Sequence, residues 1–375
     1  MHFYVKSLIF VQIVWINDMK SSVGRLFLQA VAAVCLPFMT VSCHSGGYVT
    51  ITGYAQGGTY MVKVDTQGTD VPPEDIKDGI DSTLVAFDNS LSGYNPSSLL
   101  TRFNAGETIR PDSTFIGIYR LSRHFYDMTD GAFDVSAAPL FDMWGFGFTS
   151  DSLPGPAEVE AVLRYIGMRR LVPDLADALS PSGTLDGADA VADGNPAHRP
   201  HLNYNAIAQG YSCDLVAGYL ESLGITSMLV DIGGEIVCSG YNPAGKPWTI
   251  GVDRPYDGND VSGADLKGVL EAGPERCGVV TSGNYRKFYV VDGRKYAHTI
   301  DPRTGYPVSH SLLSATIVAD DAATADALAT YCMVIGFEKA AEFIGSRQDL
   351  EGYLIYDDGG EMRTWKSPGF RLVRE

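Results

Sequence analysis

The spacing of apolar residues predicts several amphipathic helices along the chain. Between residues 74 and 87, apolar side chains recur every three or four positions, which is the period of the buried face of a helix. Residues 113–128 and 322–343 show helical patterns, and a further helix is expected after residue 209. The expected inward positions are Ile76, Ile80, Leu84 and Phe87 in the first helix, and Tyr211, Leu215, Tyr219, Leu220 and Leu223 in the helix after residue 209.

Runs of β-branched and aromatic residues between turn signals predict the strands. Residues 57–64 form a glycine-led run, and residues 227–232 form an apolar run that ends in two glycines. Further strands are expected at residues 248–252, 278–282, 288–291, 296–300 and 313–318, and near residues 352–357 and 369–373. Residues 174–200 are small and acidic without periodicity, which predicts a surface loop or hairpin. The chain shows no internal repeat, heptad run or transmembrane pattern.

A rigid turn follows the expected strand at residues 296–300. Pro302 presets φ and Gly305 accepts a positive φ, so His298 stands just before a fixed bend. The simplest role of Asp301 is to cap this turn. Taken alone, His298 is first of all a structural histidine that bonds the turn, with a catalytic role as the alternative.

Asp326 and Thr330 are a candidate pair of metal ligands. They are four residues apart in a helical pattern, so their oxygens lie one turn apart on one face. A carboxylate and a hydroxyl so placed, together with a carbonyl from elsewhere, suit a hard cation such as Mg²⁺. By spacing alone, the alternative that both are ordinary polar helix positions stays open.

Composition and charge describe a globular protein with a sizeable core. Hydrophobic residues make up 45% and charged residues 19% of the 375 residues, a length that suits one large domain or two ordinary ones. The formal net charge of −17 argues against nucleic acid or an anionic membrane surface as a partner. It is compatible with a metal-assisted site, because a divalent ion reverses the local field that repels a phosphate.

The N-terminal region has the layout of a bacterial lipoprotein signal. Residues 19–42 contain basic residues, then an apolar run at residues 26–39, then a small residue before Cys43. This run is too short and wrongly flanked for a stable transmembrane span. We expect residues 1–18 to be a misassigned start, and a lipidated Cys43 to begin the mature chain with a short tether at residues 43–50. A cleaved signal of a soluble exported protein is the alternative.

Four cysteines lie beyond this leader, at Cys213, Cys238, Cys277 and Cys332. They are widely spaced and form no CxxC pair, which argues against a metal site built from sulfur. Buried free thiols are the simplest interpretation. One or two disulfides stay open as the alternative, because sequence alone does not assign the pairs.

Six stretches in the same order resemble the ApbE-type FAD:protein FMN transferases. The C-terminal ones are Thr-Ser-Gly-Asn-Tyr at residues 281–285 and His-Thr-Ile-Asp-Pro-Arg-Thr-Gly-Tyr-Pro-Val at residues 298–308, followed by the Asp326/Thr330 pair. The others lie at residues 58–60, 91–104, 131–147 and 203–214. Each motif alone is weak, but together they extend the resemblance over about residues 50–345.

The resemblance implies an α+β fold of two lobes with mixed or antiparallel sheets and packed helices, in one domain over residues 43–375. It implies that FAD is bound between the lobes with Mg²⁺ at its diphosphate. The implied metal ligands are Asp326, Thr330 and the backbone carbonyl of Ala206, and the implied catalytic residue is His298. The implied FAD-lining positions are Gly57, Ser92, Gly93, Tyr94, Ala132, Phe133, Asp134, Asn203, Ser282, Gly283 and His298.

The resemblance also implies a reaction and a partner. Such enzymes transfer FMN from FAD to a threonine or serine hydroxyl of a protein that carries a short Ser/Asp-Gly-Ala-Thr/Ser segment, and they release AMP. The nearest match in this chain, residues 262–265, lacks the hydroxyl, so we expect the acceptor to be another protein. With a lipid anchor at Cys43, that acceptor is expected to be an exported or membrane redox protein of the cell envelope, at the periplasmic face of the inner membrane.

Three other functions remain open at this point. An FAD hydrolase uses the same fold and Mg²⁺ site, with water in place of the protein hydroxyl. A non-catalytic flavin-binding lipoprotein keeps the pocket but does not need Asp326, Thr330 and His298 together. A carbohydrate-binding surface lipoprotein fits the leader and the 20 tyrosines, but explains none of the ordered motifs.

Overall fold

The computed structural model describes residues 47–146, 153–170, 185–186, 201–259, 261, 263–285, 288–291 and 294–374, which lie in one compact unit. The helices are α2 (Pro73–Leu91), α3 (Leu99–Asn104), α4 (Ser113–Met128), α5 (Ala138–Met143), α6 (Pro156–Leu163), α8 (Ala208–Ser222), α9 (Ala322–Ile335) and α10 (Phe337–Gly345), with a 3₁₀ turn at Thr66–Gly68. The strands are β1 (Tyr48–Ala55), β2 (Gly58–Asp65), β3 (Thr108–Ile109), β4 (Leu185–Asp186), β5 (Met228–Ile232), β6 (Glu235–Ser239), β7 (Trp248–Asp253), β8 (Leu266–Ala272), β9 (Cys277–Gly283), β10 (Phe288–Val291), β11 (Arg294–Ala297), β12 (Ile300–Asp301), β13 (Tyr306–Pro307), β14 (Leu312–Ala319), β15 (Glu351–Asp358), β16 (Glu361–Lys366) and β17 (Leu372–Arg374).

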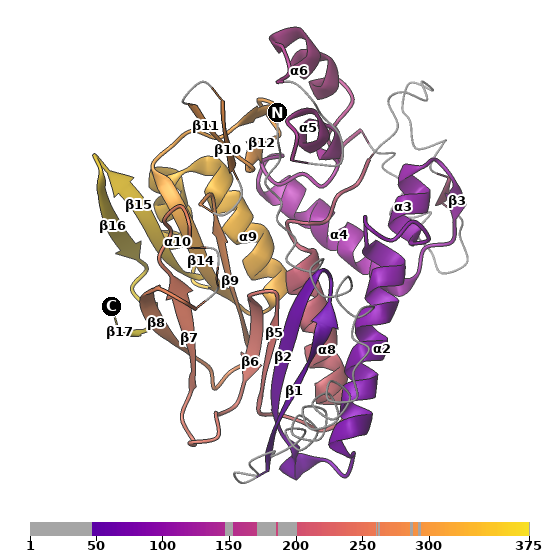
Figure 1. The fold of residues 1–375 in the computed structure, drawn as a ribbon, viewed down its shortest axis with the longest axis vertical. Coiled ribbons are helices and arrows are strands. Elements are labelled where there is room, and N and C mark those ends of the chain that lie inside the picture. Colours follow the sequence, from indigo (N-terminus) through magenta and orange to yellow (C-terminus); the bar gives the residue numbers. More distant parts are fainter. Residues whose placement is uncertain are drawn as a thin grey trace, which may run out of the picture. The chain divides into compact units, whose positions relative to one another are not determined.

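An antiparallel sheet of eight strands forms the centre of this unit, in the order β1-β2-β5-β6-β9-β14-β15-β16 (Figure 1). β1 and β2 form a hairpin whose two turn residues, Gln56 and Gly57, both have positive φ, as a tight I′ turn requires. Helices α9 and α10 connect β14 to β15, and α8 leads into β5. The sheet therefore brings together segments from both ends of the described chain.

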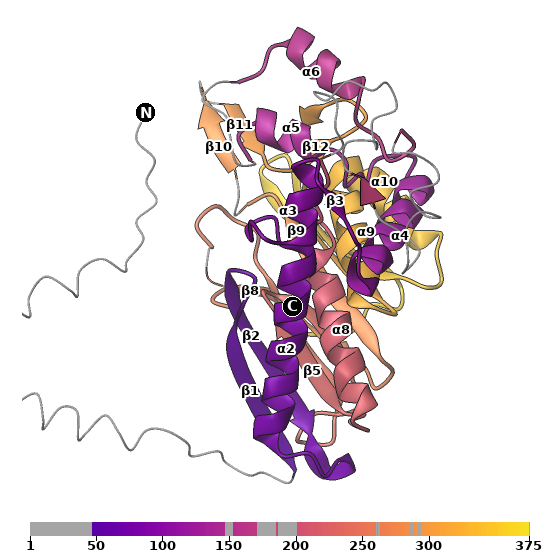
Figure 2. The ribbon, with the colours of Figure 1, turned by 90° about the vertical axis from the view of Figure 1, so that its right-hand side faces the viewer.

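The two faces of this sheet pack against different layers, because successive side chains of a strand point to opposite sides. In β5, Met228 and Val230 belong to the core shared with α2, α8 and α9, whereas Leu229 belongs to the core shared with β7 and β8. Strands β7 and β8 form a second antiparallel sheet with β17. Figure 2 shows α2 and α8 side by side along β1, β2 and β5.

Helix α8 is packed more tightly than its sequence indicates. Of the five expected inward residues, only Leu220 is fully buried, and the other four are partly buried at the edge of the core. The fully buried stripe uses small side chains instead, among them Cys213, Val216 and Ala217. Since α8 lies against the sheet, α2 and α9 at once, it presents small residues where neighbouring backbones come close.

Several expected boundaries are wrong. The single helix expected at residues 322–343 is two helices, because Gly336 has a φ of 81° that a helix interior does not allow. β1 begins at Tyr48, inside the expected tether, and β6 and β8 were not expected. Residues 1–46, and most of the loop expected at 174–200, lie outside the described residues; within that loop, Leu185–Asp186 pairs with β3.

A smaller apolar cluster forms a second lobe from α5, α6 and the β12–β13 hairpin. Leu140, Val162 and Ile300 are among its buried residues. The indole Nε1–H of Trp144 donates a hydrogen bond to the Gly305 carbonyl at 2.7 Å, which ties the end of α5 to the hairpin turn. This lobe fixes the chain on both sides of His298.

Candidate functional site

Two carboxylates hold the N-terminus of α9. Asp321 is the N-cap and accepts a hydrogen bond from a first-turn N–H at 2.7 Å. Asp214 of α8 accepts the N–H groups of Ala322 and Ala323 at 3.1 and 2.8 Å, and Arg276 donates to it at 2.8 Å. Burial raises the pKa of Asp214 to about 6 in spite of these donors. The contacts fix the start of α9 against α8 and β9.

Asp326 lies one turn into α9 and is only 5% exposed. Its Oδ2 accepts a hydrogen bond from the Gly210 N–H at 3.1 Å. Burial raises the pKa of Asp326 to about 7, and the neighbouring charge of Asp214 acts in the same direction. The first turn of α8, whose N–H groups favour negative charge, thus binds a carboxylate of the protein itself.

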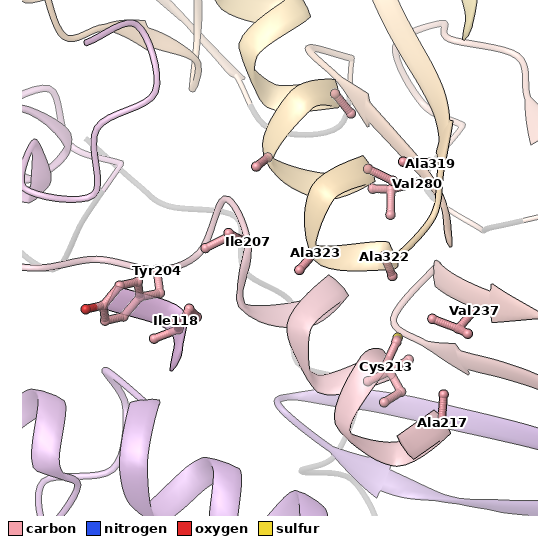
Figure 3. Close-up of a cluster of buried hydrophobic side chains, with 14 of the residues drawn as sticks. Ile118, Tyr204, Ile207, Cys213, Ala217, Val237, Val280, Ala319, Ala322 and Ala323 are labelled. Carbon is pink, nitrogen blue, oxygen red and sulfur yellow. The ribbon is translucent and has the colours of Figure 1, made fainter. Parts of the chain in front are cut away.

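The close contact between the two helices depends on Gly210. A Cβ at this position would lie 2.3 Å from the Ala322 carbonyl oxygen and 2.9 Å from the Asp326 Cβ. Figure 3 shows the start of α9, with Ala322 and Ala323, beside the turn of α8 that carries Cys213. A glycine inside a helix lowers helix stability by about 1 kcal/mol relative to alanine. At Gly210 this loss accompanies the close contact between α8 and α9.

Thr330 lies one turn after Asp326, and its Oγ1 is 3.5 Å from the Ser282 Oγ of β9. Two residues beyond Ser282, the Asn284 Oδ1 accepts a hydrogen bond from the Thr299 hydroxyl at 2.6 Å. Strand β12, which follows Thr299 directly, packs against α9. The structure therefore brings the end of β9, including Gly283, and the segment of His298 to α9, the helix that carries the predicted metal ligands Asp326 and Thr330.

His298 is half-buried between β11 and β12. Its ring lies edge-on to the Phe146 ring, with centroids 6.4 Å apart. The turn after it is fixed as expected, because Asp301 accepts hydrogen bonds from the Arg303 N–H at 3.0 Å and from its guanidinium at 2.9 and 2.8 Å. The capping role predicted for Asp301 is confirmed.

The segment before α8 joins a second group of predicted residues. The Asn203 N–H donates to the Val135 carbonyl at 2.8 Å, so the residues after Asp134 lie against this segment. The Asn203 Oδ1 accepts the Asn205 N–H at 2.8 Å and so closes its own turn. Ala206 follows this turn, two residues before α8 begins.

A cavity of about 210 Å³ lies over this segment and includes three of the predicted FAD-lining residues, Gly93, Tyr94 and Asn203. The Ser92 hydroxyl shapes its rim by accepting the Tyr94 N–H at 3.3 Å. Tyr94 is 76% exposed where it lines this cavity, so its ring lies at the mouth and not in the core. A cavity of this size takes one part of a dinucleotide rather than the whole molecule.

The Ala132–Asp134 positions differ in what they can offer a ligand. Ala132 and Phe133 are each 2% exposed, and the Phe133 ring packs edge-on against Phe125 in the core. Only their backbone groups are candidates for a contact. The Asp134 carboxylate accepts the Ser136 N–H and hydroxyl at 2.9 and 2.5 Å, and burial raises its pKa to about 6.

Gly57 is exposed at the tip of the β1–β2 hairpin, and a Cβ built there meets no described atom within 4 Å. The structure thus places it in a turn where a side chain would meet open space among the described residues. A larger cavity of about 630 Å³ lies on the opposite face of the main sheet, near Lys63, Asp231, Thr281 and Thr316. None of the predicted site residues lines that cavity, so we assign the function to the smaller one.

The residues around Asp326 fit a hard cation. Keeping a buried carboxylate ionised costs free energy when it receives only one described hydrogen bond and has no positive partner. The raised pKa of Asp326 reflects this cost. Thr330 adds a hydroxyl oxygen, and Ala206 lies close along the chain to Gly210. Among the described residues, no group of three or more His, Cys, Asp or Glu side chains could hold a metal. The predicted donors, one carboxylate and neutral oxygens, are a set that suits Mg²⁺ when a substrate supplies phosphate oxygens.

Sequence reasoning missed the parts that Gly210 and Asp214 play. Both lie in the 203–214 stretch, and a glycine in the first turn of a predicted helix was the available signal. No local signal showed that Asp214 caps a helix more than 100 residues further along the chain.

Fold and site together define an α+β protein in which α8 and α9 pack closely around a buried carboxylate, and a small cavity lies over the segment that leads into α8. The ApbE family model matches residues 48–354, and the chain belongs to the ApbE family. An FAD:protein FMN transferase of Escherichia coli K12 is 32% identical over 308 residues, covering 80% of this chain and 83% of that protein. A Haemophilus influenzae protein of the same name is 29% identical, covering 94% of this chain and 99% of its own length.

Solved structures agree with this assignment. The flavin transferase ApbE from Vibrio cholerae superimposes with a TM-score of 0.71 at 28% identity and covers 86% of this chain and 97% of its own. The apo form of the Pseudomonas stutzeri flavinyl transferase ApbE gives a TM-score of 0.72 at 29% identity, covering 86% and 95%. The α+β fold expected from the sequence is confirmed.

Proposed function

We propose that this protein transfers FMN from FAD to a threonine or serine hydroxyl of a partner protein, with Mg²⁺ bound at Asp326, Thr330 and the Ala206 carbonyl. The observation that carries the proposal is the buried Asp326 carboxylate, held between α8 and α9 with Thr330 one turn away. Relatives over most of the chain bear the name of this activity. When bound, Mg²⁺ supplies positive charge that offsets the charge of the diphosphate.

The chain's own residues then have separable tasks. In the transfer, the acceptor oxygen forms a bond to the flavin-side phosphorus of FAD, the bond from that phosphorus to the AMP oxygen breaks, and AMP leaves. His298 takes the proton of the acceptor hydroxyl as general base. Gly93, Tyr94 and Asn203 line the cavity that takes part of FAD, and the Asn284–Thr299 bond keeps the segment of His298 in place.

We also propose that the protein works in the cell envelope, tethered by lipid on Cys43 and facing the periplasm. The support is the lipoprotein-type leader at residues 19–42, which lies outside the described residues. A tethered transferase without an acceptor segment of its own modifies proteins that it meets there. The expected acceptor is an exported or membrane redox protein with a Ser/Asp-Gly-Ala-Thr/Ser segment.

The proposal is tested by incubating the full chain with FAD, Mg²⁺ and an acceptor domain that carries such a segment, followed by mass spectrometry of the acceptor. The expected result is an acceptor heavier by one FMN, together with free AMP. A matched acceptor with valine at the hydroxyl position should stay unmodified. Free FMN and AMP with an unmodified acceptor would instead identify an FAD hydrolase. Unchanged FAD would contradict both activities and support a non-catalytic flavin-binding protein.

A further inference from the structure

Two cysteines lie opposite each other in the main sheet. Cys238 of β6 and Cys277 of β9 are direct partners in the antiparallel register. Their sulfur atoms are 3.7 Å apart, although 39 positions separate the residues in the sequence. Directly opposed residues of antiparallel strands have Cα atoms about 4.5 to 5.5 Å apart, which is within the range that a disulfide spans.

The other two described cysteines have no such partner. Cys213 and Cys332 are fully buried in the core between the sheet and the helices. The Cys213 thiol donates to the Glu235 carbonyl at 3.1 Å. Within the described part of the chain, neither Cys213 nor Cys332 is paired with another cysteine. Cys238 and Cys277 belong to the opposite side of the sheet, where β7 and β8 pack.

The two thiols of the pair are electrostatically different. The hydrogen bond between the two thiols lowers the pKa of the Cys277 thiol, and the Gly273 backbone and the nearby Arg276 charge act in the same direction, against burial and the Glu275 charge. The same hydrogen bond and burial raise the pKa of Cys238. Cys277 is also partly exposed, whereas Cys238 is buried. Cys277 is therefore the thiol that an oxidant reaches first.

We propose that Cys238 and Cys277 are a modification site that forms a cross-strand disulfide when the protein meets a disulfide oxidant. The Cys277 thiolate attacks the oxidant's sulfur–sulfur bond, forming a mixed disulfide and releasing one thiolate. The Cys238 sulfur, on losing its proton, attacks the Cys277 sulfur and releases the second thiolate. Two electrons pass to the oxidant, and the two protons of the pair end on its two thiols.

The bond would join two central strands of the sheet. It closes a long loop in the unfolded chain, which lowers the entropy gained on unfolding and so favours the folded state. The oxidised protein should therefore unfold at a higher temperature than the reduced one. Because the pair lies on the side of the sheet that faces β7 and β8, the inference does not depend on the proposed transfer reaction.

The test equilibrates the full chain with oxidised glutathione, alkylates the remaining thiols and maps the peptides by mass spectrometry. We expect one cross-linked product of Cys238 and Cys277, and alkylation of Cys213 and Cys332 only after denaturation. The midpoint of thermal unfolding should rise on oxidation and return on reduction. A Cys277→Ala variant should lose both effects, whereas Cys332→Ala, which removes a thiol without a partner, should keep the cross-link.

Two outcomes would overturn the proposal. One is full alkylation of both thiols in folded wild-type protein after equilibration with the oxidant. The other is glutathione bound to Cys277 with no cross-link to Cys238. The wild-type measurement decides the question even where a variant folds poorly.

Discussion

At the scale of single residues, the site depends on charged and polar groups held out of water. Asp326 has a pKa near 7 because burial disfavours the ionised carboxylate. A cation bound beside the carboxylate would stabilise the ionised form and so offset the cost of burial. His298 is different, because it is half-buried and held by the turn that follows it. Substitutions at the two residues should therefore have different effects.

Replacing Asp326 with alanine should abolish Mg²⁺-dependent transfer while the fold remains. The carboxylate is the one charged group of the proposed ligand set, and its loss removes most of the affinity for a divalent ion. Thr330→Val should be milder, because a neutral ligand contributes less. Transfer rates measured over a series of Mg²⁺ concentrations check this, and near-wild-type activity of Asp326→Ala at low Mg²⁺ would contradict the metal assignment.

Mg²⁺ binding should weaken as the pH falls below about 7, the pKa of Asp326. Below that pKa the carboxylate carries a proton, which must leave before the metal can bind. The affinity should fall by up to about tenfold per pH unit there and should be nearly constant at higher pH. Calorimetric titration of Mg²⁺ with FAD present measures this; an affinity independent of pH across this range would show that Asp326 is not a ligand.

His298→Ala should still bind FAD but should lose about two to four decades of transfer rate, the usual contribution of a general base. Single-turnover kinetics separate the two effects, and FAD fluorescence reports binding. Weaker FAD binding with an unchanged rate would instead support a structural role for this histidine.

At the scale of elements, the site depends on how α8 and α9 meet. The carboxylate of Asp214 caps α9 from α8, and Gly210 lets the two backbones approach. A glycine also allows β9 to approach α9 closely, because a Cβ at Gly278 would lie 2.3 Å from the Ala322 nitrogen. These three positions set the place of α9, and through it the place of Asp326.

Gly210→Ala should lower the free energy of unfolding by about 1–3 kcal/mol, the usual cost of overpacking, and should weaken Mg²⁺ binding. Gly218→Ala in the same helix is the matched control. Gly218 is exposed and a Cβ there meets no described atom within 4 Å, so alanine should stabilise the helix by up to about 1 kcal/mol. Urea unfolding compares the two variants; equal effects would mean that Gly210 is not a contact position.

At the scale of the whole molecule, we expect the proposed anchor to set the location of the protein and the described domain to set its activity. The described domain begins its sheet at Tyr48, a few residues after Cys43. A tether this short would keep the domain close to a membrane that holds the lipid. Two acyl chains, as on a lipoprotein cysteine, give lasting attachment where one does not.

Changing Cys43 to alanine should abolish lipid labelling and membrane fractionation and leave FAD cleavage by the purified protein unchanged. Metabolic labelling with a fatty acid, together with fractionation of cells, measures both properties. A Cys43→Ala protein that stays with the membrane, or a wild-type protein found in the cytoplasm, would contradict the anchor and the choice of partner that follows from it.

Much of the fold could be predicted from local patterns. The α4 boundaries at Ser113 and Met128 agree with the expected residues, and most predicted strands fall within one or two residues of the observed ones. The errors have physical causes. Gly336 interrupts a run whose apolar pattern continues on both sides, and α8 buries small residues that a search for large apolar ones does not find.

The sequence by itself determined most of the helices and strands, the family motifs and the one-turn spacing of Asp326 and Thr330, because each depends on residues close together in the chain. Only the tertiary structure decided that Asp214 caps α9, that Gly210 binds Asp326 and that Cys238 faces Cys277. These contacts join residues 39 to 116 positions apart. They depend on sheet order and helix packing, which follow from burial of the whole core and are not encoded in any local spacing.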